Sequence, residues 1–124
     1  MNIYISHSRS FDFKKELYTP ILNSPLASQH KFILPHAESD MPFTSKELLM
    51  NKGCDLIIAE VSYPATGQGI ELGWANLLNI PIVCIYQDGA TPSPSLALVS
   101  SKMMMYTSTE NMIEDITGLL RNYE

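Results

Sequence analysis

The stretch from Cys54 to Gly73 constrains the fold of this chain more than any other part of the sequence. It begins with an apolar, strand-like run at residues 56–61, passes through a turn rich in proline and glycine, and ends in a helical segment. A buried strand that feeds a helix is the building unit of α/β proteins, in which ligands bind in the crevice outside the carboxyl ends of the strands. We expect Glu71 in the first turn of that helix, where backbone N–H groups favour an ionised carboxylate.

Three glycines mark the same stretch. We interpret Gly67 and Gly69 as turn residues that let the backbone approach a ligand, and Gly73 as a residue that lets the helix lie close to the sheet. Their spacing, G-x-G-x-x-x-G, is one residue longer than the dinucleotide-binding fingerprint, and no Gly-Lys-Ser or Gly-Lys-Thr of a P-loop occurs. Neither of these nucleotide-binding motifs is therefore predicted.

Strand-like and helical segments alternate along the whole chain. The strand-like segments are residues 2–6, 31–34, 56–61, 80–86 and 103–106, and two of them, 56–61 and 80–86, are nearly continuous apolar runs typical of parallel strands covered on both faces. With right-handed crossovers, this alternation predicts an α/β fold: a single five-stranded parallel sheet with helices on both faces and the flavodoxin-like order 2-1-3-4-5. The length of 124 residues and the apolar content of 45% predict one domain, residues 1–124.

The helices are predicted from apolar residues at helical spacing. The first contains Phe13, Leu17 and Ile21, and Pro20 should bend or end it; a second surrounds residues 44–52, and residues 91–95 form a loop. We expect Thr107 and Glu110 to form a capping box before the last helix, and the Met103–Met105 run to be core. The side chains expected to face the core are Ile70, Trp74, Leu77 and Leu78 in the third helix and Met112, Ile113, Ile116, Leu119 and Leu120 in the last.

Composition excludes several classes of partner. The formal charge of −5 comes from scattered side chains, which argues against nucleic acid or an anionic membrane. Cys54 and Cys84 lack the spacing of a disulfide scaffold or a zinc site and are interpreted as buried free thiols in a reducing compartment. No signal peptide and no apolar run near the ~20 residues of a membrane span is present. We therefore expect a cytoplasmic protein.

The predicted sheet gathers the loops near Ser8, Ser62 and Gln87 around Glu71. A lone glutamate at a helix start usually stabilises only the helix end, but the glycines and the apolar surroundings favour a site here. Glu47 lies among apolar neighbours, where partial burial would raise its pKa and suit it as a proton donor; the alternative is a solvated helix residue.

Two further groups of polar residues allow a functional and a simple interpretation. Ser8 and Arg9 either hold a phosphate or only cap the first helix. His36, Glu38 and Asp40 have metal-ligand side chains, but their alternating loop pattern favours a hydrated loop, and no metal site is predicted. His7 beside Ser8 does not predict a nucleophile pair, because adjacent side chains rarely meet in the geometry of a catalytic triad.

The segment Asp55-Leu-Ile-Ile-Ala-Glu-Val-Ser, followed by Pro64, Gly67, Gly69 and Glu71-Leu-Gly73, resembles the nucleoside 2-deoxyribosyltransferase family. The closest likeness is to its small 2'-deoxynucleoside 5'-phosphate N-hydrolase branch, it is dense from residue 55 to 95, and it implies a single domain of this type. It also implies that Glu71 is a nucleophile that attacks the anomeric carbon and forms a glycosyl ester, which water or a second base resolves.

The resemblance assigns further roles. Tyr4 matches a tyrosine that positions the nucleophile, and Glu47 stands where the family has an aspartate acid. Ser95 matches a serine that reaches the 5'-phosphate from the neighbouring subunit, which implies a homodimer. The chain departs from the family at His7-Ser8-Arg9-Ser10-Phe11, in place of a glycine-rich loop, and at Ala65, in place of a phosphate-contacting serine that Thr66 would replace. The candidate substrate-binding residues are Ser8, Arg9, His36, Thr66, Gly67, Gly69 and Ser95.

The leading hypothesis is an enzyme that cleaves the N-glycosidic bond of a 2'-deoxyribonucleoside or its 5'-monophosphate, by hydrolysis or base exchange, without a metal or another cofactor. One alternative is a nucleotide-binding or signalling module that uses the same crevice without turnover. Another is an NAD-cleaving domain of TIR type, which shares the opening Tyr-Ile-Ser-His phrase. A response regulator is discounted, because such receivers have acidic residues where this chain has His7 and Ser8.

Overall fold

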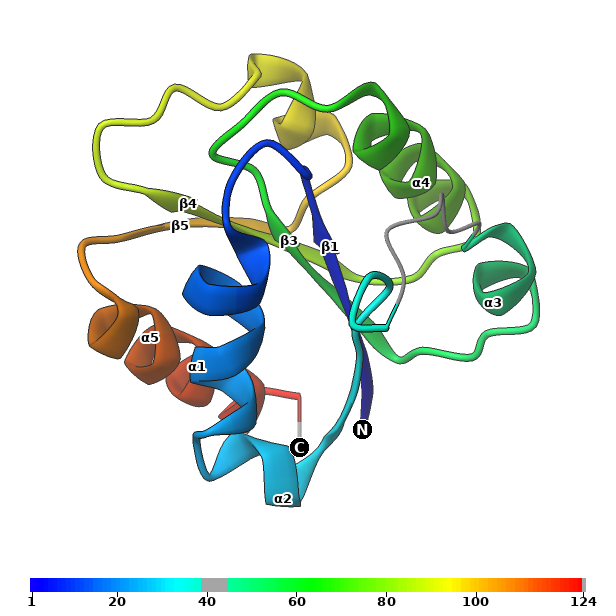
Figure 1. The fold of residues 1–124 in the computed structure, drawn as a ribbon. Coiled ribbons are helices and arrows are strands. Elements are labelled where there is room, and N and C mark those ends of the chain that lie inside the picture. Colours follow the sequence, from blue (N-terminus) through cyan, green and yellow to red (C-terminus); the bar gives the residue numbers. More distant parts are fainter. Residues whose placement is uncertain (39–44, 124) are drawn as a thin grey trace.

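The computed structural model describes residues 1–38 and 45–123, and it confirms the predicted α/β fold. Five parallel strands form one sheet in the order β2-β1-β3-β4-β5 (Figure 1). The strands are β1 (Asn2–His7), β2 (Lys31–Ile33), β3 (Leu56–Glu60), β4 (Ile82–Gln87) and β5 (Lys102–Tyr106). The order reverses between β1 and β3, so the loops that leave these two strands diverge and open a crevice at the sheet edge.

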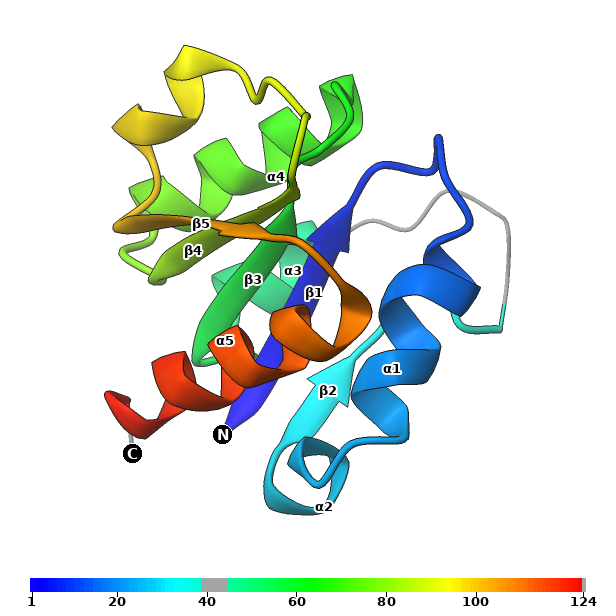
Figure 2. The ribbon, with the colours of Figure 1, turned by 90° about the vertical axis from the view of Figure 1, so that its left-hand side faces the viewer.

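Helices cover both faces of the sheet. The π-helical turn η1 (Lys14–Tyr18) continues into α1 (Thr19–Leu22), and with α2 (Leu26–Gln29) and α5 (Thr109–Arg121) it lies on one face (Figures 1 and 2). The other face carries α3 (Lys46–Met50) and α4 (Thr66–Leu77), and a 3-10 helix, η2 (Pro94–Leu98), precedes β5. The short helices α2 and η2 were not predicted from the sequence.

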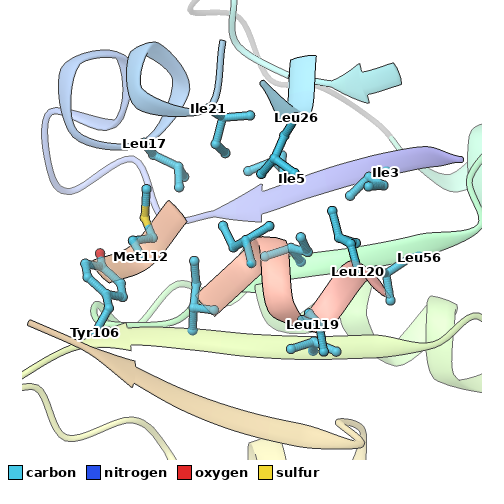
Figure 3. Packing of buried hydrophobic residues seen from close by; sticks show 14 of the residues in the cluster. Ile3, Ile5, Leu17, Ile21, Leu26, Leu56, Tyr106, Met112, Leu119 and Leu120 are labelled. Atoms are coloured by element: carbon cyan, nitrogen blue, oxygen red, sulfur yellow. The ribbon is translucent and has the colours of Figure 1, made fainter. Parts of the chain in front are cut away.

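Alternate residues of each strand point to opposite faces, which divides the core into two layers. Ile3 and Ile5 of β1 pack under α1 and α5 with Leu17, Ile21 and the apolar side of α5 (Figure 3). Tyr4, from the same strand, points to the opposite layer, with Leu49 of α3 and Leu72 of α4. This alternation places the Tyr4 side chain on the face where α4 carries Glu71.

The predicted inward face of α4 is right for Trp74 and Leu78, which are half-buried against the core, and wrong for Ile70 and Leu77. Ile70 is 50% exposed and Leu77 is 81% exposed, whereas the buried residues of this helix are Gln68, Leu72 and Ala75. The helix begins at Thr66, earlier than expected, so Gly67 and Gly69 are helical rather than turn residues and Glu71 lies in the second turn. Gly73 is exposed, and a Cβ atom there would meet nothing within 4 Å, so it does not serve close packing against the sheet.

Other helix ends differ from the predictions by smaller amounts. The first helix continues through Pro20 and ends at Leu22. The last helix is capped by Ser108, whose hydroxyl accepts the Asn111 N–H at 3.0 Å, while Asn111 Oδ1 accepts the Thr107 N–H at 2.9 Å. The capping box is therefore formed by Ser108 and Asn111 instead of Thr107 and Glu110.

The buried side chains of α5 confirm the predicted face, with Met112, Ile116, Leu119 and Leu120 buried and Ile113 half-buried. The methionine run is core only at Met104, because Met103 and Met105 alternate to the other face of the edge strand and are exposed. Cys54 and Cys84 are buried free thiols, as expected. Within residues 1–38 and 45–123, no helix combines the length and the apolar character needed to cross a bilayer.

Candidate active site

A cavity of about 360 Å³ opens at the reversal of strand order between β1 and β3. Its wall comes from the loop after β1, the end of the segment after β2, and the turn between β3 and α4. The residues that line it are Tyr4, His7, Ser8, Arg9, Ser10, Pro35, His36, Pro64, Ala65, Gly67, Gln68 and Glu71. The structure therefore brings together Glu71, Tyr4 and four of the predicted substrate-binding residues, namely Ser8, Arg9, His36 and Gly67.

Glu71 projects from the second turn of α4, and two hydroxyl groups hold one of its carboxylate oxygens. Tyr4 Oη donates to Glu71 Oε2 at 3.0 Å, and Ser45 Oγ donates to the same oxygen at 2.8 Å. Glu71 Oε1 receives no hydrogen bond from the described residues. Within the described residues, the carboxylate is thus oriented through one of its two oxygens.

Tyr4 is suited to act as a permanent donor to this carboxylate. It is 1% exposed, and burial, together with the negative charge of Glu71, raises its pKa well above the ordinary value. The phenol therefore keeps its proton at physiological pH and the hydrogen bond to Glu71 persists. Ser45 is buried directly before α3; sequence reasoning missed it, because only the tertiary fold brings it to Glu71.

The loop after β1 is folded on itself by its own polar groups. Ser8 is buried, and its hydroxyl accepts the Ser10 N–H at 3.0 Å, so it shapes this loop instead of capping the first helix. Arg9 is exposed and lies in the cavity wall beside Ser8 and Ser10. Phe11 stacks on Tyr63 at a ring distance of 5.2 Å and an interplanar angle of 23°, which joins this loop to the turn after β3.

A chain of hydrogen bonds fixes the opposite wall. His7 Nδ1 lies 2.7 Å from the Ser8 carbonyl oxygen, which can only accept, so Nδ1 carries the proton. Nε2 then accepts from Tyr18 Oη at 2.5 Å, and the Tyr18 oxygen accepts the His36 backbone N–H at 3.1 Å. Burial lowers the pKa of His7 to about 4 and raises the pKa of Tyr18 to about 12, so both rings are neutral near pH 7.

The first turn of α4 forms part of the cavity wall. The helix begins at Thr66, and the N–H groups of its first residues have no partner within the helix. Gly67 and Gln68 of this turn line the cavity, and Gln68 Nε2 donates to the Glu60 carbonyl oxygen at 2.9 Å, which fixes the turn to the end of β3. Sequence reasoning did not single out Gln68.

The remaining predicted site residues lie elsewhere. Thr66, Gly69 and Ser95 line a second, mainly apolar cavity of about 540 Å³ between α4 and residues 91–99. Glu47 is exposed on α3 and does not line the Glu71 cavity, so of the two interpretations the solvated helix residue holds and the partly buried proton donor does not. Asp40 lies outside the described residues. Within them, no group of three His, Cys, Asp or Glu residues is arranged to hold a metal ion.

Glu60, which sequence reasoning also missed, ties the ends of three strands together. It is 1% exposed and accepts the Ser62 N–H at 2.7 Å, the Ser62 hydroxyl at 2.9 Å and the Tyr106 hydroxyl. Ser62 Oγ in turn accepts the Gln87 N–H at 2.7 Å. Burial raises the pKa of the Glu60 carboxyl. This network fixes the turn that leads from β3 to the first turn of α4.

Fold and cavity together define a small α/β protein with flavodoxin-like strand order and an oriented carboxylate at the topological switch point. No family model matches the chain. It is 49% identical over 68 residues to a protein of Syntrophotalea carbinolica named "Putative 2'-deoxynucleoside 5'-phosphate N-hydrolase 1", a match that covers 55% of this chain and 47% of that protein. The chain therefore spans about half the length of the curated relative it matches.

Two solved structures share the fold over nearly the whole chain. The CMP N-glycosidase BcmB of Clostridium botulinum superposes with a TM-score of 0.61 at 18% identity, covering 94% of this chain and 99% of that one. A conserved protein of Enterococcus faecalis V583 gives a TM-score of 0.56 at 14% identity over 95% and 98%. These two likenesses show the shared fold. The predicted resemblance to the small 2'-deoxynucleoside 5'-phosphate N-hydrolase branch of the nucleoside 2-deoxyribosyltransferase family is confirmed over the 68 residues matched by the curated relative.

Proposed function

We propose that this protein cleaves the N-glycosidic bond of a 2'-deoxyribonucleoside or its 5'-monophosphate, with Glu71 as the nucleophile. The observation that carries the proposal is the carboxylate itself: one oxygen of Glu71 is held by Tyr4 and Ser45, and the side chain lines a cavity at the switch point of the sheet. The name of the 49% identical relative supports the same chemistry.

In this mechanism Glu71 Oε1 attacks C1' of the sugar while the bond from C1' to the base nitrogen breaks. The electron pair of that bond goes to the base, which takes up a proton and leaves, and a glycosyl ester of Glu71 remains. Water then attacks C1' and gives up a proton, the ester bond breaks, and the sugar hydroxyl and the Glu71 carboxylate remain. A second base that attacks in place of water and gives up a proton in the same way leads to base exchange. Tyr4 and Ser45 hold Oε2 throughout, so that the attacking oxygen stays oriented.

Glu47 is the proposed source of the proton for the departing base. Its side chain is exposed and outside the cavity, so this role requires a movement of α3 when substrate binds. The expected effect of Glu47→Gln is a lower turnover with ordinary bases, and little change with a base that is already cationic and leaves without protonation.

The 5'-phosphate is proposed to bind at the first turn of α4. Backbone N–H groups there are free of helical partners, Gly67 leaves open space for a ligand, and the Arg9 guanidinium lies in the same cavity wall. Thr66, Ser8 and Gly69 are proposed to support the phosphate and the sugar. Thr66 and Gly69 face the second cavity, so that their contact with substrate depends on its extending past Gln68.

We also propose a homodimer in which Ser95 reaches the phosphate bound by the other subunit. Ser95 lines the apolar cavity and not the cavity of its own Glu71, and Leu98 beside it is 82% exposed. An exposed leucine of this kind favours burial against another surface. A second copy of the chain would cover it and bring Ser95 to a site that its own subunit does not offer.

The nucleophile is tested by incubating the protein with a panel of deoxynucleosides and their 5'-monophosphates and measuring the free base. Glu71→Gln is expected to lower base release by about a thousandfold or more. Glu114→Gln, an exposed change on α5, is the matched control and should retain full activity. Mass spectrometry with a slow 2-fluoro sugar analogue should show a covalent adduct on Glu71, and full activity of Glu71→Gln would refute the assignment.

A further inference from the structure

The ring of His36 has an unsatisfied hydrogen-bonding group in the cavity wall. His36 follows β2 and is 9% exposed, and its Nδ1 atom is buried without a hydrogen-bond partner in the described part of the chain. Nε2 has no hydrogen bond to a described residue either, but unlike Nδ1 it is not fully buried. Since the surface that His36 exposes lines the cavity, Nε2 is the ring nitrogen left for a ligand.

Both the backbone and the ring of His36 are held in place before any ligand binds. The backbone N–H donates to Tyr18 Oη, which is itself bonded to His7. The His36 ring packs edge-on against His7 at 5.6 Å and an interplanar angle of 73°, and it lies 5.9 Å from the Phe13 ring. A fixed ring can bind a ligand without first losing much conformational entropy.

The environment of Nδ1 determines where the proton sits. Buried N–H groups without an acceptor are rarer in proteins than unpaired acceptors, so Nδ1 is the ring nitrogen favoured to lack a proton. With its proton on Nε2, His36 presents an N–H donor to the cavity.

The order of strands places this donor opposite the proposed phosphate site. The free N–H groups of α4 lie on the β3 side of the cavity, Tyr4 and Glu71 meet over β1, and His36 lies at the end of β2. A nucleotide with its phosphate at α4 and its C1' atom at Glu71 extends its base toward β2. His36 is the side chain that lines the cavity at that end.

We propose that His36 binds the nucleobase, with its Nε2–H donating to a carbonyl oxygen or ring nitrogen of the base in a deoxynucleoside 5'-monophosphate. This inference rests on the proposed function, because it requires the sugar to lie at Glu71. It assigns His36 to base recognition, in contrast to Arg9 and the first turn of α4, which face the phosphate. Substrate preference among bases would then follow from which acceptor each base presents to this donor.

The test compares two ligands in the Glu71→Gln background, where binding is measured without turnover. One ligand is the deoxynucleoside 5'-monophosphate that the unchanged protein hydrolyses fastest, and the other is 2-deoxyribose 5-phosphate, which lacks the base. His36→Phe should weaken the nucleotide about tenfold and leave the sugar phosphate unchanged. His36→Gln keeps a donor and should recover part of the loss. His30→Gln, at the amino end of β2, is the matched control and should change neither affinity.

A second measurement determines which nitrogen of the His36 ring carries the proton. Long-range proton–nitrogen NMR correlations of the imidazole should show the His36 proton on Nε2 instead of Nδ1, and Nε2 should shift on addition of the nucleotide but not of the sugar phosphate. A proton on Nδ1, or equal weakening of both ligands by His36→Phe, would overturn the inference. If the unchanged protein releases no base from any nucleotide, the proposed function fails; if it does release base and His36→Phe binds both ligands normally, only the base contact fails.

Discussion

At the scale of single residues, the site depends on neutral groups that hold their protons in fixed places. Tyr4 keeps its proton because it is buried beside Glu71, and His7 stays neutral between the Ser8 carbonyl and the Tyr18 hydroxyl. Among the described residues that line the cavity, Glu71 supplies a carboxylate and Arg9 a guanidinium group. The proposed nucleophile and a separate cation for an anionic group form an arrangement suited to a nucleotide.

Removal of the Tyr4 hydroxyl tests whether orientation of Glu71 matters. Tyr4→Phe keeps the ring in the core and deletes the 3.0 Å hydrogen bond, so Ser45 alone holds Oε2. We expect kcat/KM for base release to fall about 10- to 100-fold, with an unchanged thermal midpoint. Tyr123→Phe, near the C-terminus and exposed, is the control, and equal rates for the two variants would show that Tyr4 has no such role.

The buried neutral imidazole of His7 should make stability fall in acid. Burial lowers the pKa of His7 from 6.5 to about 4. The unfolded chain therefore binds a proton at His7 near pH 6.5, whereas the folded protein binds it only near pH 4. The stabilisation is complete above pH 6.5 and is lost as the pH falls toward 4. Glu60, whose pKa is raised, acts in the opposite direction.

Urea unfolding measures this effect. Between pH 7 and pH 5, His7 should contribute a loss of about 2 kcal/mol in the free energy of unfolding, and this part of the loss should disappear in His7→Asn. The difference between the two pH profiles isolates His7 from the other titrating groups. An identical slope in the variant would mean that folding does not lower the pKa of His7.

At the scale of elements, the sequence predicts strands better than helix faces. An apolar run bounded by polar residues predicts a parallel strand directly, which is why β3, β4 and the order of the sheet follow from the sequence. The face of α4 does not, because Ile70 and Leu77 are apolar yet exposed, and the small residue Ala75 takes the buried position. Hydrophobic spacing cannot distinguish a face that packs on the sheet from one available to another surface.

The same limit applies to the site. Glu71 was predictable because its neighbours in sequence form the strand, the turn and the helix that place it. Ser45 and Glu60 were not, since Ser45 meets a residue 26 positions away and Tyr106, which bonds to Glu60, is 46 positions away. Contacts between residues so far apart in the chain cannot be predicted from a local sequence pattern. Glu47 shows the converse, since apolar neighbours in sequence did not bury it.

The helical glycines of α4 allow a direct test of the corrected helix. Because a Cβ atom at Gly73 would meet nothing within 4 Å, Gly73→Ala should raise the free energy of unfolding by about 1 kcal/mol through helix propensity. Gly53→Ala is the contrasting variant, since its Cβ would overlap the Leu48 side chain and lie 3.2 Å from the Leu48 carbonyl oxygen, and it should not stabilise. Destabilisation by Gly73→Ala in urea unfolding would restore the close-packing interpretation.

At the scale of the whole molecule, five of the eight exposed large apolar side chains of the described residues come from α4, η2 and β5. Ile70 and Leu77 lie on α4, Leu98 ends η2, and Met103 and Met105 lie on the edge strand β5 that follows it. They belong to the half of the sheet that carries the apolar cavity. This arrangement supports the proposed dimer, in which Ser95 completes the partner's site.

Mixing two inactive variants tests that dimer. Glu71→Gln lacks the nucleophile and Ser95→Ala lacks the proposed phosphate contact, but a mixed dimer contains one site with both residues intact. After equal mixing and subunit exchange, activity should recover to about a quarter of that of the unchanged protein. If Ser95 acts within its own subunit, mixing restores nothing, and if Ser95→Ala alone is fully active, the residue has no such role. Sedimentation velocity should show a dimer in both preparations.

The network around Glu60 has a consequence for how proteins built on this plan diversify. The Glu60 carboxylate links the ends of β3, β4 and β5 through Ser62 and Tyr106, neither of which lines the Glu71 cavity. The cavity residue Gln68 bonds only to the backbone carbonyl oxygen of Glu60. The residues that hold the strand ends are thus largely separate from the residues that line the cavity. His36 and Arg9 can be exchanged without removing a hydrogen bond of the Glu60 network. New ligand preferences are therefore accessible by single substitutions, with little penalty in foldability.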